Sequence, residues 1–123
     1  MNLENLKRIA LVGATTNKEK YGYIILKDLT GKGFDVIPIT PKYEEIEGIK
    51  TVKSVGELDK NIDLIVFVVP PKVGLSVTKE AIENGFRTLW YQPGAYSSEI
   101  DTFLKEKRID AVHDKCIMVE TRR

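Results

Sequence analysis

The stretch Leu64-Ile65-Val66-Phe67-Val68-Val69 is apolar at every position, and Pro70-Pro71 ends it. A strand with one face in water alternates apolar and polar residues, whereas an unbroken apolar run is typical of a strand buried on both faces. Strands of that kind lie in the middle of parallel sheets whose two faces are covered by helices. The run is far shorter than the roughly 18 apolar residues that a membrane helix requires. It therefore predicts a central strand.

Shorter apolar runs lie on both sides of this stretch and predict its neighbours. They occupy residues 9–12, which end at Gly13, residues 34–39, which Pro38 is expected to break, and residues 88–91 and 109–112. The short piece 49–52 is a further candidate strand. These runs give a chain of short strands separated by longer segments.

The segments between the strands have apolar residues at helical spacing. The predicted helical faces are Tyr21, Ile24, Ile25 and Leu29; Val73, Val77, Ala81 and Ile82; and Ile100, Phe103 and Leu104. Gly31, Gly33 and Gly85 predict helix ends, and Ser97 or Ser98 is the expected N-cap of the third helix. The pattern Ser54-Val55-Gly56-Glu57 is a capping box that predicts a brief extra helix.

The alternation of strands and helices predicts an α/β fold. Because parallel strands joined by right-handed crossovers admit few topologies, we expect a Rossmann-like, doubly wound parallel sheet in three layers, α/β/α. The strands at 34–39 and 64–69 should flank the strand at 9–12. With 123 residues, the chain has the usual size of one domain, so we expect residues 1–123 to form a single domain.

The composition excludes several classes of function. The chain carries 19 Lys and Arg against 18 Asp and Glu, a net charge of +1, which argues against binding nucleic acid or an anionic membrane through an overall field. One cysteine and one histidine exclude an internal disulfide and a multi-cysteine or histidine-rich metal site. The first residues, Met1-Asn2-Leu3-Glu4-Asn5, lack the pattern of a signal peptide, so we expect a soluble, cytoplasmic protein.

The loops after the strands should meet at one edge of the sheet, where such folds bind ligands. In the first loop, Gly13 permits a tight turn, and the start of the following helix, Thr15, Thr16, Lys18 and Lys20 would favour an anion such as a pyrophosphate. The loop is neither G-x-G-x-x-G nor a Walker motif, so a plain strand–helix turn is the alternative.

The second and third loops narrow the ligand class. The second strand ends in Thr40-Pro41-Lys42 and lacks the acid that NAD enzymes place there. A lysine at this position would attract a phosphorylated ribose, as in NADP or coenzyme A, unless it is an ordinary surface lysine. Val69-Pro70-Pro71 could form a flat wall for an adenine ring or a pantetheine arm, or could simply start a helix.

Candidate catalytic residues are few. His113 with Asp114 follows the last predicted strand, Cys116 comes shortly after, and no G-x-S-x-G elbow is present to position a serine. A structural histidine and a buried, unreactive cysteine are the simpler interpretations. We therefore assign no catalytic residue and no metal ligand.

Five segments together resemble the small, single-domain CoA-binding proteins, which are similar to the CoA-binding domain of the succinyl-CoA synthetase alpha subunit. They are Val12-Gly13-Ala14-Thr15, residues 36–43, Val68-Val69-Pro70-Pro71, Leu89-Trp90-Tyr91-Gln92-Pro93-Gly94 and residues 114–120. They follow one another in the family's order over nearly the whole chain. One departure is Lys18-Glu19-Lys20, where relatives often have a proline in the first loop.

The resemblance implies a set of ligand contacts for coenzyme A. The diphosphate would lie against Gly13, Ala14, Thr15, Thr16, Lys20 and Tyr21; the adenosine and its 3′-phosphate against Thr40, Pro41 and Lys42; the nucleotide against Val69, Pro70 and Pro71; and the thiol arm against Gln92, Pro93 and Gly94. Cys116 is the last candidate, with the hypothesis that it forms a mixed disulfide with CoA under oxidation.

The function expected from these observations is that of a non-catalytic CoA or acyl-CoA binding module, acting as a sensor or regulatory subunit. The chain is too short to add the phosphohistidine and nucleotide-grasping domains of a complete ligase. The alternatives are a small NADP-dependent reductase, a subunit of an acyl-CoA ligase that needs a partner chain, and a scaffold that binds only protein.

Overall fold

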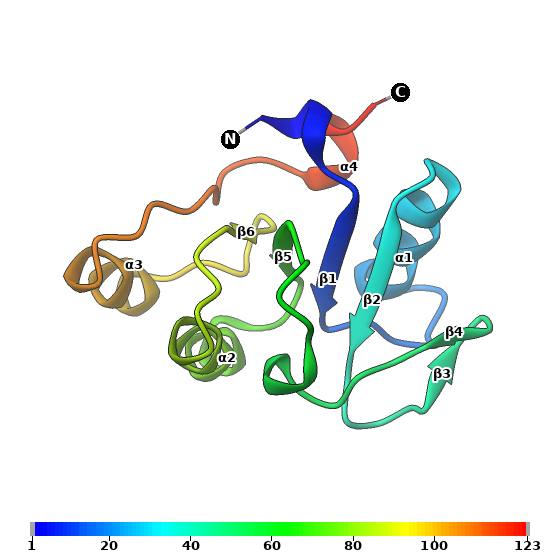
Figure 1. Ribbon diagram of the computed structural model, residues 1–123, viewed down its shortest axis with the longest axis horizontal. Helices are drawn as coiled ribbons and strands as arrows, with labels where there is room; N and C mark the ends of the chain where they lie inside the picture. The colour runs from blue at the N-terminus through cyan, green and yellow to red at the C-terminus, as the bar shows by residue number, and fades with distance from the viewer. Residues whose placement is uncertain (1, 123) are drawn as a thin grey trace.

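The central sheet of the protein is parallel and has four strands, as a computed structural model describing residues 2–122 shows (Figure 1). The strands are β1 (Arg8–Val12), β2 (Asp35–Ile39), β5 (Leu64–Phe67) and β6 (Leu89–Tyr91), in the order β2-β1-β5-β6. β1 pairs with β2 on one side and with β5 on the other, so the predicted arrangement of these three strands is confirmed. All four residues of β5 are buried, as an apolar run in a central strand requires.

Helices cover both faces of the sheet (Figure 1). Helices α1 (Tyr21–Gly31) and α4 (Ile117–Glu120) lie on one face, and α2 (Pro71–Glu83) and α3 (Ser98–Glu106) lie on the other. A hydrophobic core lies on each face of the sheet, and successive side chains of β1 point to opposite faces. Ile9 and Leu11 pack with α1, while Ala10 and Val12 pack on the α2 and α3 side. The predicted three-layer α/β/α fold is therefore confirmed. Among residues 2–122, every helix falls short of the length and apolarity that a bilayer crossing demands.

The second strand differs from the prediction at Pro38. β2 is not broken there but runs through Pro38, which stands in register with Leu11 of β1. β2 is the edge strand of the sheet, and an edge strand tolerates a residue without a backbone N–H. The carbonyl of Pro38 accepts the N–H of Val52 at 3.0 Å, so the returning chain covers this edge.

Two predicted strands do not join the sheet. Residues Ile49–Lys50 (β4) pair with Glu45–Ile46 (β3) in a separate antiparallel hairpin, and only Val52 bridges to Ile39. In the segment 109–112, a single bridge joins Val112 to Trp90, because Ile109 packs into the core of the α2 and α3 side instead of aligning with β6.

The helices form where predicted, and Ile100 and Leu104 of α3 are buried as expected, but the buried faces of α1 and α2 are shifted. In α1 the buried residues are Gly22, Ile25, Leu26 and Leu29, whereas Tyr21 is 65% exposed. In α2 the buried residues are Gly74, Thr78 and Ala81, and Val73 is 49% exposed.

The residues Val55–Glu57 form a short 3-10 helix (η2), but the Ser54 side chain does not cap it. The side chain of Glu57 instead accepts the backbone N–H of Lys53 at 3.1 Å. A second 3-10 helix, η1, spans Leu3–Asn5.

Ser97, and not Ser98, caps α3. Its Oγ accepts the backbone N–H of Ile100 at 3.2 Å. Replacing an N-cap serine by alanine typically costs about 1 kcal/mol. We expect Ser97→Ala to lower the free energy of unfolding by about that amount in denaturant titrations, with Ser98→Ala, one residue inside the helix, as the matched control. Equal stability of the two variants would contradict this assignment.

Candidate functional site

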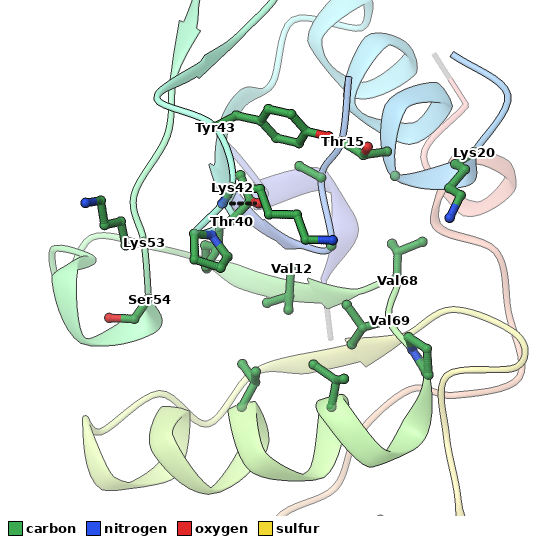
Figure 2. Close-up of a pocket in the computed structure, with 18 of the residues that line it drawn as sticks. Val12, Thr15, Lys20, Thr40, Lys42, Tyr43, Lys53, Ser54, Val68 and Val69 are labelled. Carbon is green, nitrogen blue, oxygen red and sulfur yellow. Dashed lines mark hydrogen bonds between the residues drawn. The ribbon is translucent and has the colours of Figure 1, made fainter. Parts of the chain in front are cut away.

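A pocket of about 860 Å³ opens at the carboxyl ends of β1, β2 and β5. The chain passes from β1 to β2 on one side and later to β5 on the other, so the pocket lies at the point where the winding direction reverses. Its walls are the loop after β1 with the start of α1, the turn after β2, the segment 53–55, and the end of β5 with α2 (Figure 2). This is the edge at which the sequence predicted a ligand site.

Two glycines bring the start of α1 against the pocket. Gly13 has a φ of +101°, and a Cβ there would lie 2.5 Å from the carbonyl oxygen of Val68. A Cβ on Gly22 would lie 2.1 Å from the carbonyl oxygen of Gly13. The loop therefore passes directly over the end of β5, and the first turn of α1 presses against the loop. The absence of a side chain at Gly22 therefore permits this close packing.

The N-terminus of α1 faces this pocket without a side-chain cap. The N-cap residue is Lys20, which makes no side-chain capping hydrogen bond. Backbone N–H groups in the first turn of a helix lack intrahelical partners, and together with the helix dipole they favour a negative charge. Lys20 and Tyr21 both line the pocket, so an anion bound there would meet N–H groups and a cation.

Three lysines line the pocket, from three different segments: Lys20, Lys42 and Lys53. Within residues 2–122, none of the three forms an ion pair. Glu19 and Glu80 also belong to the lining. The lysines thus leave a net positive charge around the pocket, which suits a ligand with several phosphates.

The turn after β2 positions Lys42. The side chain of Thr40 is buried, and its Oγ1 accepts the backbone N–H of Lys42 at 3.2 Å. The N–H of Thr40 in turn donates to the carbonyl of Val52 at 2.9 Å. Figure 2 shows the Lys42 side chain extending from this turn over Val12. A buried threonine therefore fixes the backbone from which an exposed lysine reaches into the pocket.

Much of the pocket lining is apolar. The apolar lining residues are Val12, Ile39, Pro41, Val55, Val68, Val69, Pro70, Val73 and Val77. Pro70 is the N-cap residue of α2 and Pro71 is its first residue, so these prolines do start a helix, and Pro70 lines the pocket as well. A polar rim with an apolar wall can hold a molecule that has both a flat ring and phosphates.

The structure brings most of the predicted contact residues together. Gly13, Ala14, Thr15, Lys20, Tyr21, Thr40, Pro41, Lys42, Val69 and Pro70 line the pocket. Thr16, Pro71, Gln92, Pro93, Gly94 and Cys116 are not among the lining residues. Of these, Thr16 lies beside the pocket, because it directly follows the lining residue Thr15 in the loop after β1.

Gln92 and Cys116 form a cluster of their own. The side chain of Gln92 is buried; its Oε1 accepts the N–H of Ile117 at 2.7 Å, and its Nε2 donates to Cys116 Sγ at 3.2 Å. Trp90 Nε1 donates to the carbonyl of Lys115 at 2.9 Å. These contacts hold the start of α4 against the end of β6, which gives Gln92 a structural role.

Several lining residues were not predicted as site residues. Lys53, Ser54 and Val55 reach the pocket only because the chain returns from the β3–β4 hairpin alongside β2. Val73 and Val77 were predicted only as part of a helical face, and both line the pocket. The spacing correctly indicated one helical face, but it could not show whether a ligand site or a core lies opposite.

The model of the family described as the CoA binding domain matches residues 7–122, which include every residue of the pocket. The chain belongs to this CoA binding domain family. The resemblance seen in the sequence is thereby confirmed. The chain is similar to the uncharacterized protein YneT of Bacillus subtilis, with 31% identity over 117 residues, covering 95% of this chain and 87% of YneT.

This CoA binding domain also resembles a segment of much larger enzymes. It is 36% identical over 106 residues to an ADP-forming acetate–CoA ligase of Methanocaldococcus jannaschii, covering 86% of this chain but only 15% of the ligase. Among solved structures, a conserved hypothetical protein from Pyrococcus furiosus superposes with a TM-score of 0.93 at 59% identity, covering 94% of this chain and 100% of that protein. Sequences similar to this chain therefore occur both as part of a longer ligase and as proteins of about the same length.

Proposed function

We propose that the protein binds coenzyme A, or a short acyl-CoA, in the pocket at the carboxyl ends of β1, β2 and β5, and that it acts as a non-catalytic sensor or regulatory subunit. The observation that carries this proposal is a pocket with three lysines outside any ion pair of residues 2–122, beside an uncapped helix N-terminus, in a CoA binding domain. Coenzyme A has a diphosphate and a ribose 3′-phosphate, so it carries the charges that these groups would neutralise.

In this proposal the two ends of the pocket take different parts of the nucleotide. The diphosphate lies against the loop of Gly13, Thr15 and Lys20 and the first turn of α1. Lys42 meets the 3′-phosphate, and the adenosine packs against the apolar wall around Val69 and Pro70. The remaining proposed contacts are Ala14, Thr16, Tyr21, Thr40, Pro41 and Pro71 along the nucleotide, and Gln92, Pro93, Gly94 and Cys116 along the outer part of the thiol arm.

The non-catalytic role rests on the chemistry of the lining. Within the described residues, the pocket lining contains neither histidine nor cysteine. His113 lies elsewhere, with its ring stacked on Tyr96 at 4.0 Å between centroids and its Nδ1 3.1 Å from Asp114. The groups that do line the pocket suit binding and charge neutralisation.

The similarity to ligases favours a second role, that of a subunit of an acyl-CoA ligase. The chain spans 15% of the length of the M. jannaschii ligase, so the protein would supply the CoA-binding part of such an enzyme and a partner chain would supply the rest. Both roles use the same CoA site.

Calorimetry with three ligands tests the binding proposal. We expect saturable binding of CoA, weaker binding of dephospho-CoA, which lacks the 3′-phosphate, and weak or no binding of NADP. Binding of NADP without binding of CoA would instead support the reductase. Absence of binding to all three would refute the CoA site and favour a scaffold that binds protein.

Cys116 adds a separate prediction. The thiol is partly exposed and lies beside Gln92, and the hypothesis is that it forms a mixed disulfide with the thiol of CoA. Diamide would take up the two electrons and two protons that the two thiols lose. After treatment with diamide and CoA, mass spectrometry should show one added CoA minus two hydrogens on the folded protein and none on Cys116→Ser. An unchanged mass of the wild-type protein would refute the hypothesis.

A further inference from the structure

Tyr43 joins two walls of the pocket. It follows Lys42 in the turn after β2 and lines the pocket. Figure 2 shows its ring reaching across to Thr15, in the loop after β1. Thr15 lines the same pocket, and Thr16 follows it in the loop. The phenol therefore lies at the loop to which the proposed function assigns the diphosphate.

The surroundings of this phenol differ from those of two other tyrosines. Tyr23 and Tyr96 donate to carboxylates, at 3.0 Å to Glu47 and 2.6 Å to Asp101. Burial and these carboxylates raise the pKa of both groups. The hydroxyls of Thr16 and Thr15, assisted by the charges of Lys42 and Lys20, instead lower the pKa of Tyr43. Its surroundings thus favour negative charge, as a phosphate site must.

The phenol O–H is a hydrogen-bond donor placed beside cationic side chains of the pocket lining. A tyrosine hydroxyl can donate its proton to an acceptor. Lys42 directly precedes Tyr43 in the turn after β2. Lys42 and Lys20 act on the same group, and both line the pocket. An anionic oxygen in the pocket would satisfy this donor.

We propose that Tyr43 is a phosphate-binding residue of the pocket, whose O–H donates to an oxygen of the diphosphate at the loop after β1. This inference rests on the proposed function, and it adds a diphosphate contact that lies on the turn of Lys42. Tyr43 and Lys42 are thereby assigned to different phosphates of the same ligand.

Two ligands and three variants test the assignment by calorimetry. Loss of a hydrogen bond to a charged group weakens binding by about tenfold or more. We expect Tyr43→Phe to weaken CoA and dephospho-CoA by the same factor of about ten, because both ligands carry the diphosphate. Lys42→Met should weaken CoA and leave dephospho-CoA nearly unchanged. Tyr23→Phe, which removes a hydroxyl bonded to Glu47 outside the pocket lining, is the matched control and should bind both ligands as the wild type does.

The outcomes distinguish failure of the proposed function from failure of the Tyr43 inference alone. If the wild-type protein binds neither ligand, the proposed function and this inference both fail. If it binds both and Tyr43→Phe binds them equally well, the inference alone fails. Weakening of CoA but not of dephospho-CoA by Tyr43→Phe would move Tyr43 to the 3′-phosphate and overturn the assignment. A melting temperature of Tyr43→Phe equal to that of the wild-type protein would show that the variant is folded.

Discussion

Lys42→Glu is expected to weaken CoA binding by about a hundredfold or more. Loss of a charge-assisted hydrogen bond costs about 1.5–3 kcal/mol, and reversal of the charge adds repulsion between the carboxylate and the 3′-phosphate. Thr40 holds the backbone of the turn through its bond to the Lys42 N–H, which the substitution leaves in place. The effect should therefore appear in the dissociation constant and not in the stability of the protein.

Lys72→Glu is the matched control for this prediction. Lys72 is exposed on α2, close in sequence to the pocket residues but outside the lining. It should reduce CoA binding only slightly, and less still at high salt, because exposed charges are screened. If Lys72→Glu and Lys42→Glu reduced the affinity equally, the effect would come from overall charge, and the specific role of Lys42 would be wrong.

Gly22→Ala is expected to lower the free energy of unfolding by about 3 kcal/mol or more. The added Cβ would lie 2.1 Å from the carbonyl oxygen of Gly13 and 3.1 Å from its carbonyl carbon. Gly13 cannot move away easily, since it is itself confined by the carbonyl of Val68. Relief of the clash requires α1 to shift from the loop, which should also weaken CoA binding. Denaturant titration followed by circular dichroism measures the loss.

Gly31→Ala provides the comparison within the same helix. Gly31 is the last residue of α1, and an added Cβ there has no atom within 4 Å. Reduced freedom of the unfolded chain should leave the stability unchanged or raise it by about 0.4–1 kcal/mol. If Gly22→Ala were as stable as Gly31→Ala, α1 would not start against Gly13, and the described shape of the pocket would be wrong.

The sequence was sufficient to predict a strand where the strand's own residues show which of its faces are buried. The apolar run at residues 64–69 identified the central strand because both faces of β5 are covered. Pro38 was misjudged because its tolerance depends on β2 being an edge strand, which is a property of the assembled sheet. Residues 109–112 were assigned to a strand on apolar content alone, although Ile109 contributes to the core of the α2 and α3 side.

The candidate site could be predicted where a loop directly follows a strand. Gly13 and Lys42 come straight after β1 and β2, so the topology alone places them at the same edge. Lys53 and Val77 carry no such signal, because their position depends on the hairpin and on the side of α2 that faces the pocket. The approach of the Tyr43 ring to Thr15 likewise joins segments that only the folded chain brings together.

A crystal structure of the protein with CoA tests the central claim most directly. We expect CoA in the pocket between β1, β2 and β5, with the diphosphate against residues 13–21 and Tyr43 and the 3′-phosphate beside Lys42. CoA bound elsewhere on the molecule, or bound in this pocket with its phosphates away from both Lys42 and the first turn of α1, would contradict it.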